Sequence, residues 1–253
     1  MLIDHAARRL LWDACHNVRD IGGYDTADGR HIRWRAVVRA DDLCNLSEEG
    51  SERLIDYGIR TVIDLRGPWE SPHDSSPFAR SSRYAETVTY LNLPVIDVTE
   101  FTGSPVERAR TIEESYRVIL DVYQSEIAAV MTAIARARAG GILIHCHAGK
   151  YRTGLITGLL LSLAGVPVET LAEDYALSDT YLQPLYDRWL EHVPENADPE
   201  MVERLRQYEL CLPDTMLATL SYIDERHGGA ESYLIDAAVD PRDVERIRQR
   251  IVE

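Results

Sequence analysis

Ten consecutive residues near the middle of the chain combine a thiol, two cations and a hydroxyl at close spacing. The segment is His145-Cys146-His147-Ala148-Gly149-Lys150-Tyr151-Arg152-Thr153-Gly154. Lys150 is the one lysine of a chain whose 27 cationic side chains are otherwise all arginine. Cys146 and Arg152 are separated by five residues. A nucleophilic thiol beside a planar guanidinium is suited to hydrolysing phosphate esters, because the guanidinium can bind two phosphate oxygens at once.

The elements around this loop would position its chemistry. An apolar strand over 142–144 leads into the loop, and an apolar helix begins near Thr153. A loop that ends at a helix N-terminus turns backbone N–H groups inward and adds the positive end of the helix dipole, so it can hold an anion. A Cys146 thiolate stabilised there would attack phosphorus, giving a phosphocysteine that water then hydrolyses. Thr153 could donate its hydroxyl to the departing thiolate.

The loop resembles the signature of the cysteine-dependent tyrosine-phosphatase superfamily, C-x5-R followed by Ser or Thr. More narrowly, the chain is similar to the bacterial PtpB-like tyrosine and lipid phosphatases, whose loops have the form HCxxGKxRTG. Further blocks that match this family are 17–23, 39–43, 61–66 and the tail residues Gly228, Gly229, Tyr233 and Leu234. The resemblance implies a phosphomonoesterase with Cys146 as nucleophile, Arg152 as phosphate clamp and Lys150 as a source of loop electrostatics.

The residues between the nucleophile and the clamp would form the phosphate cradle. They are His147, Ala148, Gly149, Lys150 and Tyr151. Tyr151 stands where the family commonly carries an aspartate regarded as a proton donor. A phenol has an ordinary pKa of about 10, so Tyr151 would instead narrow the pocket or stack on an aromatic leaving group.

Two histidines flank the nucleophile. We expect His147 to shape the loop or line its rim, because no other cluster of His, Cys or Asp has the spacing of metal ligands. His145 would hydrogen-bond to the loop. No metal or cofactor is therefore expected.

The general acid is sought elsewhere in the chain. Residues 90–97 (Tyr-Leu-Asn-Leu-Pro-Val-Ile-Asp) resemble the Y-x-x-I-P-V-x-D segment of dual-specificity phosphatases, whose final aspartate protonates the leaving oxygen and later activates water. This resemblance implies that Asp97 is the acid and base; the alternative is a helix or turn cap. Asp20 and Asp64 are the other candidates, which we expect to hold loops by accepting backbone hydrogen bonds, and Arg19 could brace the site.

The pattern of strands and helices predicts one α/β domain over 1–253. A central, partly parallel sheet would be flanked by helices, with the site at the carboxyl end of a strand. We expect a helix over 47–57 ended by Gly58, a strand over 61–65, and strand-like alternation over 84–95. Residues 112–139 have helical periodicity. Residues 98–139 would form the helical lid and insertion that the resemblance implies, and 166–253 a helical C-terminal part.

The net charge of −15 bears on partners. Such a surface repels nucleic acid and anionic lipid at long range, so neither nucleic acid nor stable membrane association is expected. No segment approaches the roughly 18 consecutive apolar residues of a membrane span. The start of the chain has no signal-peptide pattern, and the four cysteines lack C-x-x-C spacing. These features predict a cytoplasmic location; they say nothing of oligomeric state.

The expected partner is a phosphorylated substrate of unsettled class. Protein phosphotyrosine is what the family resemblance implies. A small soluble phosphomonoester, such as a nucleotide or a sugar phosphate of a biosynthetic pathway, is favoured by Tyr151, by the acidic composition and by the missing secretion signal. The acidic composition disfavours a phosphoinositide. The joint presence of Cys146, Arg152 and Thr153 disfavours a catalytically inactive phosphate-binding module.

Overall fold

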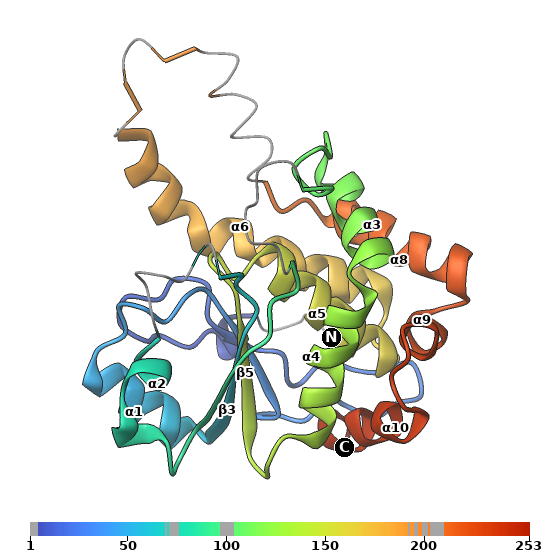
Figure 1. Ribbon diagram of the computed structural model, residues 1–253, viewed down its shortest axis with the longest axis horizontal. Helices are drawn as coiled ribbons and strands as arrows, with labels where there is room; N and C mark the ends of the chain where they lie inside the picture. The colour runs from blue at the N-terminus through green and yellow to red at the C-terminus, as the bar shows by residue number, and fades with distance from the viewer. Residues whose placement is uncertain are drawn as a thin grey trace.

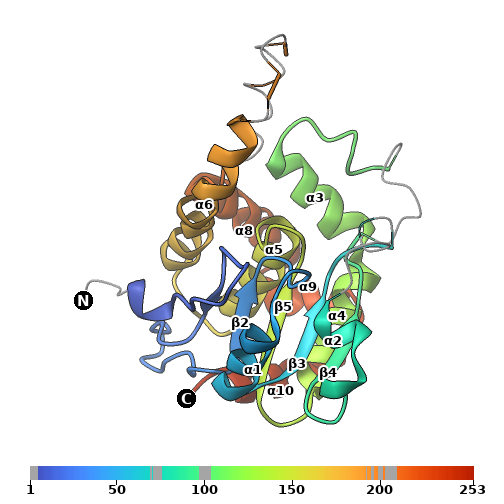
Figure 2. The same ribbon diagram turned by 90° about the vertical axis from the view of Figure 1, so that its left-hand side faces the viewer.

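A five-stranded mixed sheet lies at the centre of the protein with helices on both of its faces (Figure 1). The computed structural model describes residues 5–68, 70, 76–96, 104–191, 193–194, 197–198, 202 and 210–253. The strands are β1 Arg19–Asp20, β2 Val37–Ala40, β3 Ile59–Asp64, β4 Thr89–Asn92 and β5 Gly141–His145. Their order is β1-β2-β5-β3-β4, and only β1 runs antiparallel to its neighbour (Figure 2). The predicted partly parallel sheet flanked by helices is confirmed.

Helices supply most of the remaining structure. They are α1 Glu48–Tyr57, α2 Pro77–Arg80, α3 Ile112–Val122, α4 Gln124–Arg136, α5 Tyr151–Leu163, α6 Val168–Glu191, α8 Pro213–His227, α9 Ala230–Asp236 and α10 Pro241–Ile251. The Ser47 side chain caps α1 by accepting from the Gly50 amide, and Gly58 ends it at φ +111°, a conformation that favours glycine. The strand predicted over 84–95 is shorter than expected and covers only Thr89–Asn92, because a 3-10 turn at Ser82–Tyr84 continues into a turn whose amides at 87 and 88 bond the Tyr84 carbonyl.

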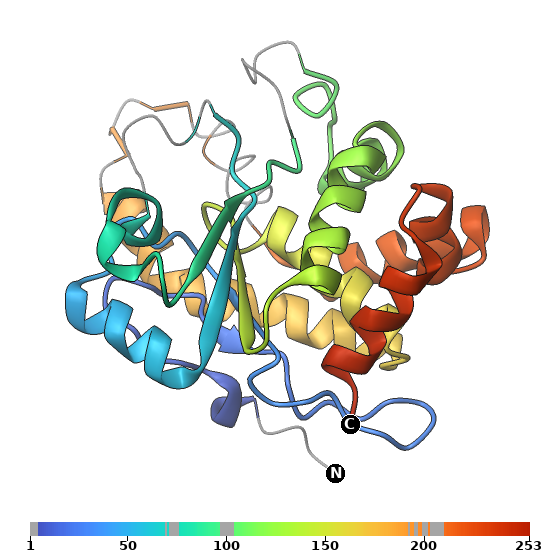
Figure 3. The same ribbon diagram turned by 60° about the horizontal axis from the view of Figure 1, so that its bottom comes forward.

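Side chains that alternate along the strands divide the interior into two cores. Ile142 and Ile144 of β5 face the core built with the helices from α3 to α10, whereas Leu143 faces the smaller core under α1 and α2. Figure 3 shows these two helix layers on opposite sides of the sheet. Ile59 and Val62 of β3 face the same side although they are three residues apart, since the strand register shifts between Ile59 and Thr61.

The segment predicted as a lid and insertion, 98–139, is described from residue 104 onward. Its two helices meet at a bend of 79°. Both contribute to the larger core, α4 with the fully buried Ile127, Val130 and Ile134. Within the described ranges, no single helix has the length and apolar character needed to cross a membrane; α3 and α4 reach them only as a bent pair.

Three parallel strands end together at one edge of the sheet. Ala40 of β2 and Asp64 of β3 are both in register with His145 of β5. The residues that follow these strands therefore meet at this carboxyl edge, and Cys146 is the first residue after the central one. This is where the sequence predicts the site.

Candidate active site

Hydrogen-bond donors outside the loop hold it in place by bonding to the carbonyls of Cys146 to Lys150. The Cys146 carbonyl lies 3.1 Å from His145 Nδ1, and the His147 carbonyl accepts from the Asp42 amide at 2.8 Å. Asn17 Nδ2 donates to the carbonyls of residues 148 and 149 at 3.0 and 3.2 Å. The Lys150 carbonyl accepts from an amide inside α5. Carbonyls held in this way are what is expected of a loop whose amides bind an anion at the start of α5.

Gly149 allows the loop to approach the end of β2. Its φ of +65° is in the left-handed region. A Cβ at this position would lie 2.3 Å from the Ala40 carbonyl oxygen, far inside contact distance. A glycine is therefore needed both for the backbone conformation and for the close approach.

Two buried arginines and one buried carboxylate connect the loop to α6. Arg39 donates to Asp174 Oδ2 at 2.7 Å and to the Gly149 carbonyl at 2.9 Å. Arg19 donates to Asp174 Oδ1 at 3.0 Å and to Asn17 Oδ1, so it orients the amide that holds the loop. Although burial would raise it, the two guanidinium groups hold the pKa of Asp174 well below its usual range. Arg19 thus braces the loop indirectly, through Asn17.

The guanidinium of Arg152 is held by a residue that the sequence did not single out. Glu70 accepts from both terminal nitrogens of Arg152, at 2.6 Å from Nη2 and more closely from Nη1. The Glu70 side chain also accepts from the Gly67 amide at 2.9 Å, which fixes its position. Both members of the pair are largely buried. A bidentate carboxylate on the terminal edge fixes the plane of the guanidinium and leaves its Nε edge pointing elsewhere.

Lys150 lies among tyrosines rather than in solvent. Its side chain is fully buried, with Nζ 3.2 Å from Tyr186 Oη of α6 and 4.6 Å from the centre of the Tyr151 ring. The Tyr151 ring in turn packs edge-on against Tyr116 of α3 at 6.2 Å. Tyr116 donates to Tyr175 of α6 at 2.9 Å. Lys150 and Tyr151 therefore connect the catalytic loop to the helices that surround it.

The other residues expected near the nucleophile have distinct surroundings. Thr153 is fully buried, and its hydroxyl has no hydrogen-bond partner within the described residues. His145 is fully buried, and burial lowers its pKa. His147 is exposed, with Nδ1 3.5 Å from an Asp42 carboxylate oxygen. The role of Thr153 as a donor to the thiolate stays a prediction.

The candidates for the general acid differ in the contacts that their carboxyl groups make. Asp64 is bound by the Arg66 guanidinium and by Tyr90 Oη; burial alone would raise its pKa, but His145 and Arg66 hold it below its usual value. Asp20 accepts from the amides of Gly22 and Arg35, both at 2.7 Å. Each of these two carboxyls therefore accepts hydrogen bonds from structural partners of its own. Asp97 lies outside the described residues.

Metal ligation finds no support among the residues that the structure describes. No group of three or more His, Cys, Asp or Glu side chains in those ranges could hold a metal ion.

A strand, a carbonyl-anchored loop and a helix that together present a cysteine and an arginine define the tyrosine-phosphatase-like class of cysteine-dependent phosphatases. The family model described as tyrosine phosphatase family matches residues 10–253. The chain belongs to this family, and it is an enzyme of that class. The resemblance inferred from the loop and the flanking blocks is thereby confirmed.

Named relatives cover most of the chain. A tyrosine-protein phosphatase of Nostoc commune is 30% identical over 220 residues, covering 85% of this chain and 74% of that protein. The triple specificity protein phosphatase PtpB of Mycobacterium tuberculosis is 26% identical over 267 residues, covering 92% and 95%. Among solved structures, P. aeruginosa TpbA has a TM-score of 0.36 and 16% identity, covering 70% of this chain and 89% of that one. Similarity at that level carries no argument about fold or function.

Proposed function

We propose that this chain hydrolyses phosphomonoesters through a phosphocysteine formed on Cys146, with protein phosphotyrosine as its substrate. The observation that carries the proposal is the loop whose carbonyls are all bound from outside, at the mouth of which Cys146 lies. Amides fixed in this way stabilise both a thiolate and the equatorial oxygens of a phosphoryl group, without reorganisation during the reaction. The family membership supports the same activity.

The reaction would proceed in two displacements. The Cys146 thiolate attacks phosphorus, the bond to the substrate oxygen breaks, and that oxygen takes a proton from the general acid. Water then attacks the phosphocysteine and gives a proton back to the carboxylate that acted as the acid, the S–P bond breaks, and thiolate and phosphate are released. The buried Thr153 hydroxyl would donate to this thiolate. We keep Asp97 as the acid on the strength of its sequence segment, since the contacts of Asp64 and Asp20 occupy them elsewhere.

Arg152 would bind the phosphate through the edge that Glu70 does not use. The Glu70 carboxylate binds Nη1 and Nη2, and no described residue accepts a hydrogen bond from Nε. The Nε edge can donate in parallel to two phosphate oxygens, a geometry that a lysine could not reproduce. Glu70 is then a positioning residue that acts through Arg152.

A small soluble phosphomonoester is the second candidate substrate. It is favoured by the aromatic surroundings of the loop, where Tyr151 is packed against Tyr116 and under the Lys150 ammonium. Such a site could enclose a compact substrate. The similarity to a triple specificity protein phosphatase is a further reason to test more than one substrate class.

The test is initial-rate phosphate release from phosphotyrosine peptides, nucleoside monophosphates, sugar phosphates and a phosphoinositide, with wild type, Cys146→Ser and Cys15→Ser. Cys15 is a matched control, because burial raises the pKa of its thiol far above the range of a nucleophile. We expect Cys146→Ser to lose all turnover, Cys15→Ser to keep it, and acid quench to trap phosphate on wild-type Cys146. Turnover by Cys146→Ser would refute the mechanism, and the absence of any release by wild type would leave a phosphate-binding module.

A further inference from the structure

A pocket of about 580 Å³ lies at the end of the sheet opposite to Cys146. Its wall includes Ala36, Gly58 and Gly141, which stand at the beginning of β2, β3 and β5. β5 runs from Gly141 to His145, so the loop begins five positions after Gly141, a span of roughly 16 Å at about 3.3 Å per residue. The pocket is therefore distinct from the site described above.

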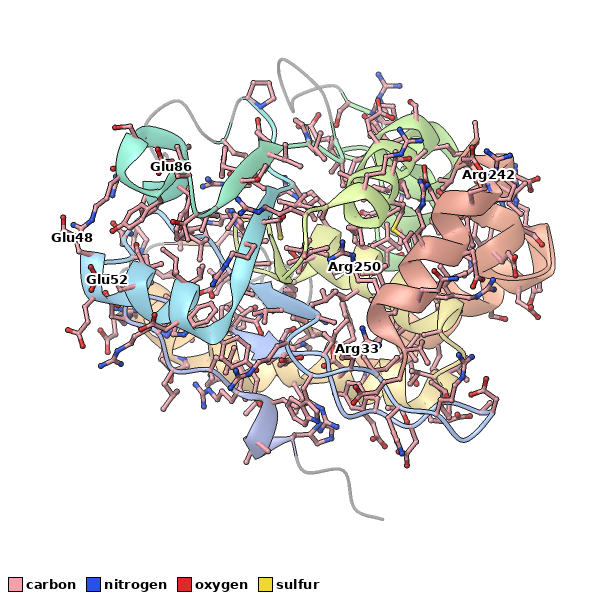
Figure 4. The ribbon with its side chains drawn as sticks, turned by 90° about the horizontal axis from the view of Figure 1, so that it is seen from below. Arg33, Glu48, Glu52, Glu86, Arg242 and Arg250 are labelled. Atoms are coloured by element: carbon pink, nitrogen blue, oxygen red, sulfur yellow. The ribbon has the colours of Figure 1, made fainter. Side chains whose placement is uncertain are left out.

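The pocket is positively charged, whereas the chain as a whole is negatively charged. Acidic residues outnumber basic ones by 42 to 27 in the whole sequence. Among the described residues that line the pocket, none is acidic and four are arginines: Arg33, Arg35, Arg246 and Arg250. Figure 4 shows Arg33 and Arg250 close together in the middle of this face, with Glu48, Glu52 and Glu86 gathered at its left.

The neighbouring carboxylates neutralise this cluster only in part. Arg33 has Glu253 at 3.5 Å, and Arg246 has Asp243 at 2.7 Å. Asp243 is shared with Arg136, which lies at the same distance. Each of these two carboxylates is therefore either loosely paired or divided between two cations.

The remaining two arginines have their own contacts. Arg250 donates to the carbonyls of residues 137, 138 and 140, and within the described part of the chain it pairs with no carboxylate. Arg35 lies over the Tyr57 ring at 5.1 Å, while the nearby Asp20 accepts from the Arg35 amide and from Tyr57 Oη. Backbone carbonyls and an aromatic ring orient these guanidinium groups without cancelling their charge.

The walls between the arginines are made of small and aromatic residues. Ala36, Ala135 and Ala139 leave room between the strands and the helices, and Trp34 is 41% exposed beside Arg33 and Arg35. A volume of about 580 Å³ falls within the range of roughly 300 to 1,000 Å³ typical of small-molecule sites. Several guanidinium forks around a space of this size match the oxygens of a phosphate chain.

We propose that this pocket is a second anion site, which binds the phosphate groups of a small polyphosphorylated metabolite. The arginines of the 33–35 segment contact the ligand from one side and those of α10 from the other. Trp34 offers its ring to an aromatic base if the ligand carries one.

Calorimetric titration with pyrophosphate and with ADP tests the proposal. The Arg152→Ala variant is used as background, so that the catalytic loop loses its phosphate clamp. In that background we compare Arg33→Gln with Arg246→Gln combined, Ala139→Glu alone, and Arg242→Gln as matched control. Arg33, Arg246 and Ala139 are exposed at least in part, so their replacement leaves the core intact. Arg242 belongs to the same helix as Arg246 but does not line the pocket (Figure 4).

We expect pyrophosphate to bind, and the double variant and Ala139→Glu each to weaken it at least about tenfold, as loss of charged hydrogen bonds implies. Arg242→Gln should bind as the background does. Tighter binding of ADP than of pyrophosphate would show that the pocket also contacts the base. Equal binding would show that it contacts the phosphates alone. The proposal is overturned if neither ligand binds, if the pocket variants bind as tightly as the background, or if Arg242→Gln loses as much as they do.

Discussion

Glu70 and Arg152 form the contact that would most directly affect phosphate binding by the proposed clamp. A buried guanidinium that loses its partner carries an uncompensated charge and regains its rotational freedom. With Glu70 on its terminal edge, the Arg152 plane is fixed before substrate arrives. Pre-organisation of this kind lowers the cost of aligning the clamp with the transition state.

Glu70→Gln should lower kcat/KM by at least about tenfold, because one charged hydrogen bond to Arg152 becomes a neutral one and the clamp loosens. Glu70→Ala should be more severe. Steady-state kinetics with a phosphotyrosine peptide measures both effects, and Glu86→Gln, an exposed glutamate, is the control. Faster turnover in Glu70→Ala would show instead that Glu70 competes with phosphate for the guanidinium.

Asp41 makes the free energy of unfolding depend on pH. It accepts from the His16 and Asn17 amides, and burial raises its pKa to about 6. Because the folded pKa exceeds the ordinary value of 3.8, protonation favours the folded state. This contribution is complete below pH about 4 and is lost as the pH rises through 6, on the order of 3 kcal/mol in all.

Asp41→Asn should remove that dependence while it keeps an acceptor for one of the two amides, a loss that does not vary with pH. The difference in free energy of unfolding, wild type minus variant, should fall by about 1 to 3 kcal/mol between pH 4 and pH 7. Urea denaturation at several pH values measures it, with the exposed Asp56→Asn as control. A difference that stays constant with pH would mean that Asp41 titrates normally.

At the residue scale, the sequence allowed us to recognise only those site residues that lie together in one short segment. The loop from 145 to 154 could be recognised because its thiol, its guanidinium and its glycine are consecutive. Glu70 could not, since 82 positions separate it from Arg152 and only the tertiary fold unites them. Asp174 was hidden for the same reason, in a helix whose pattern signals only amphipathic packing.

At the scale of elements, the loop depends on three segments that are distant in the chain. Asn17 precedes β1, Arg39 belongs to β2, and Asp174 belongs to α6. Each holds a loop carbonyl directly or orients a residue that does. The sequence predicted helices after residue 166, but it did not predict that one of them supplies the carboxylate between two buried arginines.

Asp174→Asn should destabilise the protein by about 3 to 5 kcal/mol, because it leaves the buried Arg19 and Arg39 without a counter-charge. Urea denaturation measures the loss. Asp187→Asn on the same helix is the control, since Asp187 is exposed and bonds only Gln183 within the described residues. A loss in Asp174→Asn no greater than that of the control would show that the cluster does not support the fold.

At the scale of the whole molecule, net charge conceals how charge is distributed. The value of −15 led us to expect repulsion of anions, yet one face carries a pocket lined by arginines and no acid among its described residues. The contributing positions, 33–35 and 246–250, are more than 200 residues apart. Because these arginines do not form one continuous basic segment, the sequence could not predict this pocket. The predicted cytoplasmic location and the absence of nucleic-acid and membrane partners stay predictions.

The single lysine makes the catalytic loop chemically addressable. Lys150 carries the one ε-amine of the chain, and the folded protein buries it completely beneath Tyr151 and Tyr186. An amine-directed acylating reagent can modify a side-chain amine only when the loop opens and releases this group to solvent. The rate of acylation at Lys150 therefore reports how often the loop opens. A ligand that closes the loop should lower this rate.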